Sequence, residues 1–173
     1  MSLLVATLVL ATGQVNYQPK GPKLEVFLES GRSFVIETDK DASPLTVANI
    51  VRLVKSGYYD ALRIHRVESW VIQWGDPQTR TLPAWDKRVG HGPPVPMPFE
   101  PPPVPFDRGV VGLSSKLKGT GGDGQIFIVK KDAPHLGANY TILGKVIVGM
   151  EVVDGIRKGD RISRMIVLAG RGF

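Results

Sequence analysis

The side chains that most often perform enzymatic chemistry form no familiar constellation in this sequence. The three histidines, His65, His91 and His135, show none of the spacings of metal ligands, so no metal site is expected. The chain has no cysteine, which excludes disulfides, zinc-thiolate sites and cysteine nucleophiles. No G-x-S-x-G motif is present, and the S-x-x-K match at residues 115–118 lacks its companion motifs. The sequence therefore favours a function that needs neither a metal nor a nucleophile of these kinds.

A glycine-rich run at residues 119–124, GTGGDG, matches the G-x-G-x-x-G pattern of dinucleotide-binding loops. That pattern binds a pyrophosphate where a helix begins directly after it, because the helix N-terminus faces the phosphates. Here the run is followed by QIFIVK, whose alternating apolar residues predict a strand. A dinucleotide site is therefore rejected, and no cofactor is expected.

Most of the chain has the pattern of short strands separated by turns. Residues 24–29 and 33–37 flank Ser30-Gly31-Arg32, which is a hairpin signal. Further strands are predicted at residues 63–67, 70–73, 109–113, 125–130, 140–148 and 161–168. About eight short strands with only two helices predict a mainly β protein, a closed barrel capped by the helices.

The first helix, residues 44–56, has clear start and stop signals. Ser43 can serve as N-cap, Pro44 as the first helical residue and Gly57 as a left-handed C-terminal cap. One face carries the apolar residues Val47, Ile50, Val51 and Val54. A second, shorter helix is predicted at residues 150–156, with Met150, Val153 and Ile156 directed inward.

One segment has a biased composition, HGPPVPMPFEPPPVPF at residues 91–106. Prolines cannot donate to a sheet ladder, so this segment is predicted to be a surface loop with polyproline II character. A stiff loop that crosses the barrel is favoured over a docking site for a proline-reading module.

Length and charge fit a single soluble domain. The 173 residues are 42% apolar and 22% charged, and 22 basic against 16 acidic residues give a net charge of +6. No run of five like charges concentrates this charge, so neither nucleic acid nor a membrane is an expected partner. We expect residues 1–22 to be an N-terminal extension and residues 23–173 the domain.

The apolar stretch Leu3–Ala11 is far shorter than a membrane-spanning helix. It is interpreted either as an ordered strand or as a signal-like segment, and these alternatives stay open. A cytoplasmic location is favoured, and export would follow if residues 1–13 are the remnant of a signal.

Three pairs of motifs resemble the cyclophilin family, in the order in which the family has them. The sequences IHRV and WVIQWGD resemble the family's F-H-R-V-x-P-G-F-x-x-Q-G-G-D, and RGVVGLS with DGQIFI resembles R-G-x-x-x-M-A and G-S-Q-F-F-I. The sequences LGANYTILGKV and GMEVV resemble L-D-G-x-H-x-x-F-G-x-V and G-M-x-V-V. In this chain the pairs are residues 64–67 and 70–76, 108–114 and 123–128, and 136–146 and 149–153.

The resemblance implies peptidyl-prolyl cis-trans isomerase (rotamase) activity in protein folding. Rotation about an X-Pro bond is slowed by amide resonance, with a barrier of roughly 18–20 kcal/mol. No bond breaks, so a catalyst need only bind the twisted amide better than either planar isomer. A fixed cation that donates a hydrogen bond to the prolyl nitrogen stabilises the twisted state. Arg66 matches the family's catalytic arginine.

The other residues matched to the family's site are assigned to substrate binding. Gln73 and Gln125 match polar groups near the substrate backbone, while Phe127 and Leu136 match the floor and wall of the proline pocket. The full set of substrate-binding residues is His65, Trp70, Val71, Gln73, Ser114, Ser115, Gln125, Phe127, His135, Leu136 and Tyr140.

The sequence departs from the family at several of these positions. The connection after Arg66 is one residue shorter and reads Glu68-Ser69, and Trp74 replaces a glycine, where it could crowd the site. Ser114 and Ser115 stand where Ala-Asn is usual, His135 where many members have tryptophan, and Tyr140 where they have histidine.

The expected function is therefore isomerisation of X-Pro bonds in peptides and exposed protein segments. The alternative is a binding module of the same fold that holds proline-containing segments with little turnover, which Trp74 and the shortened connection favour. The expected partners are proline-containing segments, with weak binding of cyclosporin, and the chain is expected to be a monomer.

Overall fold

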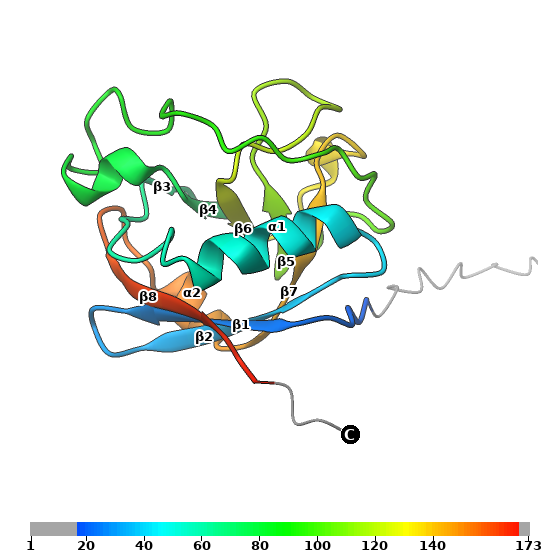
Figure 1. The fold of residues 1–173 in the computed structure, drawn as a ribbon, viewed down its shortest axis with the longest axis horizontal. Coiled ribbons are helices and arrows are strands. Elements are labelled where there is room, and N and C mark those ends of the chain that lie inside the picture. The colour runs from blue at the N-terminus through cyan, green and yellow to red at the C-terminus, as the bar shows by residue number, and fades with distance from the viewer. Residues whose placement is uncertain (1–16, 170–173) are drawn as a thin grey trace, which may run out of the picture.

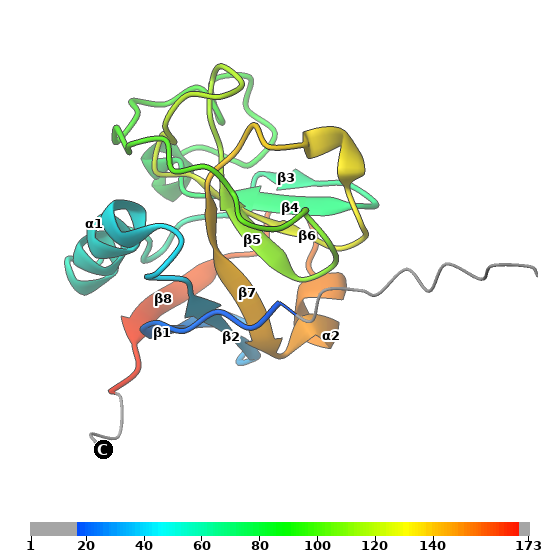
Figure 2. The same ribbon diagram turned by 90° about the vertical axis from the view of Figure 1, so that its right-hand side faces the viewer.

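The computed structural model describes residues 17–169, and the predictions on residues 3–11 lie outside this part. One sheet of eight strands forms the body of the molecule, in the order β3-β4-β6-β5-β7-β2-β1-β8 (Figures 1 and 2). All pairings are antiparallel. The strands are β1 (Lys23–Leu28), β2 (Ser33–Thr38), β3 (Arg66–Val67), β4 (Val71–Trp74), β5 (Val110–Leu113), β6 (Ile126–Val129), β7 (Ile142–Val148) and β8 (Ile162–Val167).

The sheet curls so that its two edge strands, β3 and β8, approach each other. The contact is made by the residues just before each of these strands. Arg63 and Arg161 form an antiparallel bridge. The Ile64 N–H donates to the Asp160 carbonyl at 2.8 Å, and the Ile162 N–H donates to Leu62 at the same distance. The predicted eight-stranded, mainly β barrel is therefore confirmed. Its closure is a short bridge because β3 is only two residues long and not the predicted five.

Two α-helices flank the curled sheet on opposite sides in Figure 2, α1 (Pro44–Lys55) and α2 (Met150–Asp154). Two short 3-10 helices, η1 (Pro77–Arg80) and η2 (Pro134–Leu136), complete the elements. The predicted face of α1 is largely buried: Val47, Ile50 and Val54 pack into the core with Leu53, while Val51 is half-buried.

The ends of α1 are stabilised by different groups. At the C-terminus Gly57 has φ +71°, and its N–H donates to Val54 at 3.0 Å, as the sequence predicts for a left-handed cap. At the N-terminus the Ser43 side chain does not cap the helix, because its hydroxyl donates to the Ile142 carbonyl at 2.7 Å. The Glu100 carboxylate accepts the N–H groups of Leu45 and Thr46 instead, at 3.1 and 2.9 Å.

Glu100 belongs to the proline-rich segment, which runs over α1 across the top of Figure 1. The segment is anchored to the barrel: Val95 N–H donates to Asp123 and Met97 N–H to Gly122, both at 2.9 Å. A Cβ atom at Gly121 would lie 1.6 Å from the Met97 carbonyl oxygen. The glycine-rich run therefore allows the two backbone segments to pack closely. Strand β6 follows the run where a dinucleotide site would need a helix, in agreement with the sequence prediction.

Candidate active site

A cavity of about 290 Å³ lies beside β4 and β6, under the loops that follow β5 and β6. All but one of its lining residues belong to the set predicted from the sequence, the exception being Lys118. The lining consists of Arg66, Trp70, Val71, Gln73, Ser114, Ser115, Lys118, Phe127, His135, Leu136 and Tyr140. His65 and Gln125 were predicted with this set and lie outside the lining.

Strand alternation decides which side chains of β4 reach the cavity. Val71 and Gln73 line it, whereas Ile72 and Trp74 point to the opposite face and belong to the barrel core. Trp74 is fully buried and meets Phe34 edge to face, with ring centroids 6.2 Å apart. The expectation that Trp74 could crowd the site is therefore wrong, because its ring fills the barrel interior.

Arg66 is held at the mouth of the cavity by three neighbours. Its Nε donates to Glu68 Oε1 at 2.6 Å and its Nη1 to Gln73 Oε1 at 3.4 Å. The guanidinium carbon also lies 5.4 Å from the centroid of the Trp70 ring, within the range of a cation–π contact. The hydrogen bond from Arg66 lowers the pKa of Glu68, so this carboxylate is ionised at neutral pH. The result is a fixed cation whose Nη2 has no acceptor among the described residues.

A chain of amides continues behind Arg66. Gln73, opposite Arg66 in the β3–β4 pairing, donates from Nε2 to Gln125 Oε1 at 3.0 Å. Gln125 donates in turn to the Gly90 carbonyl at 3.2 Å, and the Gly90 N–H donates to the buried Asp76 carboxylate at 2.7 Å. Gln125 thus supports Gln73 from behind the cavity, which explains why it is absent from the lining.

The floor of the cavity is aromatic and apolar. Phe127 packs against Tyr140 and Phe106, with ring centroids 5.8 and 5.5 Å apart, and Leu136 is buried beside them. A Cβ atom at Gly112 would lie 2.5 Å from Phe127 Cζ, so glycine leaves the space for this ring. The sequence does not predict this role for Phe106, because the residue ends the proline-rich segment and lies just before the matched motif at residues 108–114 and not within it.

The rim of the cavity combines an aromatic side with a polar side. The exposed His135 ring meets Trp70 edge to face, with centroids 4.7 Å apart. The polar side is formed by Ser114, Ser115 and the exposed Lys118. Nothing in the residue type of Lys118 predicts its contribution, since the course of the loop after β5 brings it to the rim.

His65 is buried with 7% of its surface exposed, and neither ring nitrogen has a hydrogen-bond partner among residues 17–169. Burial lowers the pKa of His65 to about 4. The positive charges of Lys158 and Arg66 act in the same direction, while Asp76 and the nearby Gln125 side chain oppose the shift. The ring is therefore neutral at physiological pH. It lies beside Gly90 and does not line the cavity.

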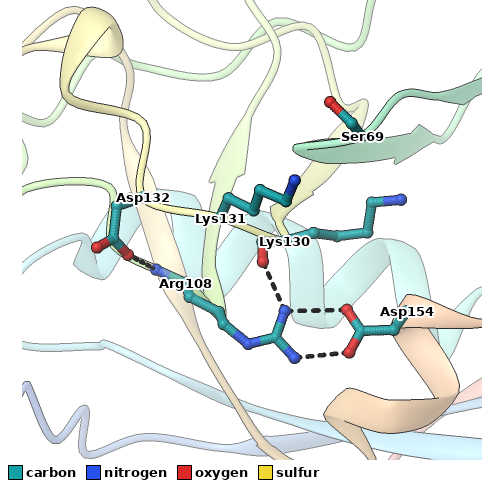
Figure 3. Close-up of a pocket in the computed structure, with 6 residues that line it drawn as sticks. All are labelled: Ser69, Arg108, Lys130, Lys131, Asp132 and Asp154. Atoms are coloured by element: carbon teal, nitrogen blue, oxygen red, sulfur yellow. Dashed lines mark hydrogen bonds and ion pairs between the residues drawn. The ribbon is translucent and has the colours of Figure 1, made fainter.

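A second hollow, of about 470 Å³, contains more charge but no free arginine (Figure 3). Both Nη atoms of Arg108 donate to the Asp154 carboxylate, at 2.9 and 2.6 Å, and its backbone N–H donates to Asp132 at 2.8 Å. These bonds join the start of β5 to the end of α2 and to the loop after β6. Their arrangement is that of a structural cross-link.

The described part of the chain offers neither a metal site nor a membrane-spanning helix. Within residues 17–169, no group of three or more histidine, cysteine or acidic side chains is placed to hold a metal ion. Over the same residues, no helix has the length and apolar character needed to cross a membrane.

A curled antiparallel barrel with a fixed cation beside an apolar cavity defines the class of this protein. Residues 24–168 match the family model described as cyclophilin type peptidyl-prolyl cis-trans isomerase/CLD. The chain therefore belongs to the cyclophilin family, as its motifs predict.

Named relatives and solved structures agree with this assignment. The chain is 37% identical over 135 residues to a probable peptidyl-prolyl cis-trans isomerase of Brucella abortus, covering 72% of this chain but only 66% of the relative's length. It is 34% identical over 140 residues to peptidyl-prolyl cis-trans isomerase B of Bacillus subtilis, covering 81% of this chain and 94% of the relative.

The fold is also that of a cyclophilin-type isomerase of Cryptosporidium parvum, with a TM-score of 0.74, 23% identity and coverage of 86% and 98% of the two chains. A further structure of that protein, at a TM-score of 0.72, 21% identity and coverage of 86% of this chain and 99% of that one, was determined in the presence of the dipeptide Ala-Pro.

Proposed function

We propose that this protein catalyses cis/trans isomerisation of X-Pro bonds in peptides and exposed protein segments, with Arg66 as the catalytic residue. The observation that carries the proposal is the position of Arg66, fixed beside a cavity whose floor is Phe127 and whose wall includes Leu136. Membership in the cyclophilin family and the names of its relatives support the same activity.

The chemistry requires a site that favours the twisted amide. The apolar floor of Phe127 and Leu136 accepts the prolyl ring, which removes that part of the substrate from water. As the bond twists, the prolyl nitrogen loses resonance and becomes a hydrogen-bond acceptor. The Arg66 guanidinium can donate to it from Nη2, and this interaction is stronger in the twisted state than in either planar isomer. Gln73 fixes the cation and offers polar contacts to the substrate backbone.

A protease-coupled assay of a short X-Pro peptide tests the proposal. We expect the unmodified protein to accelerate isomerisation. Arg66→Ala should lower the rate by a factor of about 10²–10³, because it removes a charged hydrogen-bond donor that stabilises the twisted amide. Arg32→Ala is the matched control, because Arg32 is exposed in the β1–β2 hairpin, away from the cavity. Full turnover by a folded Arg66→Ala protein would refute the assignment of Arg66.

A binding module with little turnover is the second candidate function. The shortened connection after Arg66 favours it, because this turn leads directly from Arg66 to Trp70 in the lining of the cavity. The two candidates separate in one comparison: a module would bind an X-Pro peptide in calorimetry without accelerating its isomerisation.

A further inference from the structure

Glu68 is the side chain that connects the cation of the site to the wall of the cavity. One carboxylate oxygen accepts the Arg66 Nε–H at 2.6 Å, and the other accepts the Trp70 Nε1–H at 2.9 Å. Arg66 in turn lies over the Trp70 ring. The three side chains form a closed triangle in which each contacts the other two.

The short turn between β3 and β4 explains this placement. The Glu68 N–H donates to the Val71 carbonyl at 2.9 Å, which closes the turn directly after β3. Position 68 then lies two residues from both Arg66 and Trp70, within reach of each side chain. The cyclophilin pattern has a longer, glycine-containing connection here, so the shortened connection of this chain is what brings position 68 within two residues of Trp70.

We propose that Glu68 is a positioning residue, which holds the Arg66 guanidinium and the Trp70 wall in the geometry that the twisted X-Pro amide requires. The inference rests on the isomerase function proposed above. Glu68 occupies Nε, the nitrogen nearest the backbone, and leaves Nη2 for the substrate. It does not line the cavity itself, so it acts through its two neighbours.

We expect the contacts of Glu68 to affect the rate of isomerisation and to contribute little to the stability of the fold. The side chains of Arg66 and Glu68 are 42% and 44% exposed, and ion pairs in such surroundings contribute little to stability because water screens them. The same screening weakens the offset of the Arg66 charge by the carboxylate. An arginine side chain without this anchor samples many rotamers, so the productive one becomes less populated.

The experiment compares Glu68→Ala and Glu68→Gln with the unmodified protein on one X-Pro peptide, by protease-coupled assay and by exchange NMR at high peptide concentration. We expect Glu68→Ala to lower kcat about twofold to fivefold, with little change in KM, because contacts between half-exposed side chains hold the guanidinium only modestly. Glu68→Gln should lose less, because its single amide oxygen can accept one of the two bonds. In a Trp70→Phe background only the Arg66 bond remains, so the difference between glutamine and glutamate should there be smaller.

The matched control is Glu151→Ala, which removes an exposed glutamate from α2 and should leave kcat unchanged. Urea unfolding of every variant checks that the fold is retained. A folded Glu68→Ala protein that is as fast as the unmodified protein, or faster, overturns the positioning role. If the unmodified protein itself does not accelerate isomerisation, the proposed function fails and this inference fails with it.

Discussion

His135 stands at the exposed rim of the cavity, with its ring against the edge of Trp70. Many cyclophilins have a tryptophan at the matching position, and a tryptophan there contributes apolar contact and a hydrogen bond to the cyclic peptide cyclosporin. Histidine buries less apolar area, and a deficit of a few tens of Å² removes on the order of 1 kcal/mol. The His135 ring contacts Trp70 and makes no ring contact with Phe127, the floor of the cavity.

We therefore predict weak cyclosporin binding, which His135→Trp strengthens about fivefold or more while peptide turnover changes little. Calorimetry on the two proteins measures the difference, and the protease-coupled assay supplies the comparison of turnover. Tight binding by the unmodified chain would contradict this role of His135. Since Trp74 lies in the barrel core, it contributes nothing to this weakness.

Single residues also show what sequence patterns can and cannot predict about the site. The matched motifs supply most of the lining because they lie on paired strands, where Arg66 faces Gln73 and Gln73 faces Phe127. The motif position of Trp74 predicts a place near the site, whereas the alternation of β4 places its ring in the barrel core. Lys118 and Phe106 reach the site through the paths of loops, for which local sequence carries no signal.

At the scale of elements, α1 depends on a partner from a distant segment. Its first turn has no capping side chain of its own, and the Glu100 carboxylate accepts two of its free N–H groups. Periodicity and the flanking Pro44 and Gly57 are local signals, so the extent of this helix could be predicted almost to the residue. The cap could not, because it comes from 55 residues further along the chain.

We predict that Glu100→Ala lowers the free energy of unfolding by about 1 kcal/mol, as expected for the loss of a cap at a helix N-terminus. Glu100→Gln should lose less, since its amide oxygen still accepts one N–H group. Urea denaturation of the three proteins measures the change in the free energy of unfolding. An Ala variant as stable as the unmodified protein would show that water replaces the carboxylate without cost.

At the scale of the whole molecule, a buried neutral histidine makes stability depend on pH. The pKa of His65 is about 4 in the folded protein and about 6.5 when the chain is unfolded. As the pH falls below 6.5, the unfolded chain takes up a proton that the folded protein does not, so stability is lost until about pH 4. The difference between the two pKa values corresponds to roughly 3 kcal/mol at most.

Urea denaturation between pH 7.5 and 4 should therefore show a loss of stability that is reduced in His65→Asn. The variant can be less stable than the unmodified protein at pH 7.5, because the test compares how steeply the free energy of unfolding falls as the pH is lowered. Asp123 works in the opposite direction: burial raises the pKa of its carboxyl, so the folded protein gains a proton more readily there as the pH falls. Equal slopes for the two proteins would mean that His65 titrates normally in the folded state.

The anchoring of the proline-rich segment determines where this chain can be opened for engineering. Val95 and Met97 are hydrogen-bonded to the glycine-rich run, while Glu100 binds α1 and donates its own N–H to Thr141 at 3.0 Å. An insertion between residues 95 and 100 would break contacts with three separate segments of the chain, although the proline-rich segment has the composition of a linker. The turn at Gly31 is exposed and no atom lies near its Cβ position, so a peptide tag or a fused domain belongs there.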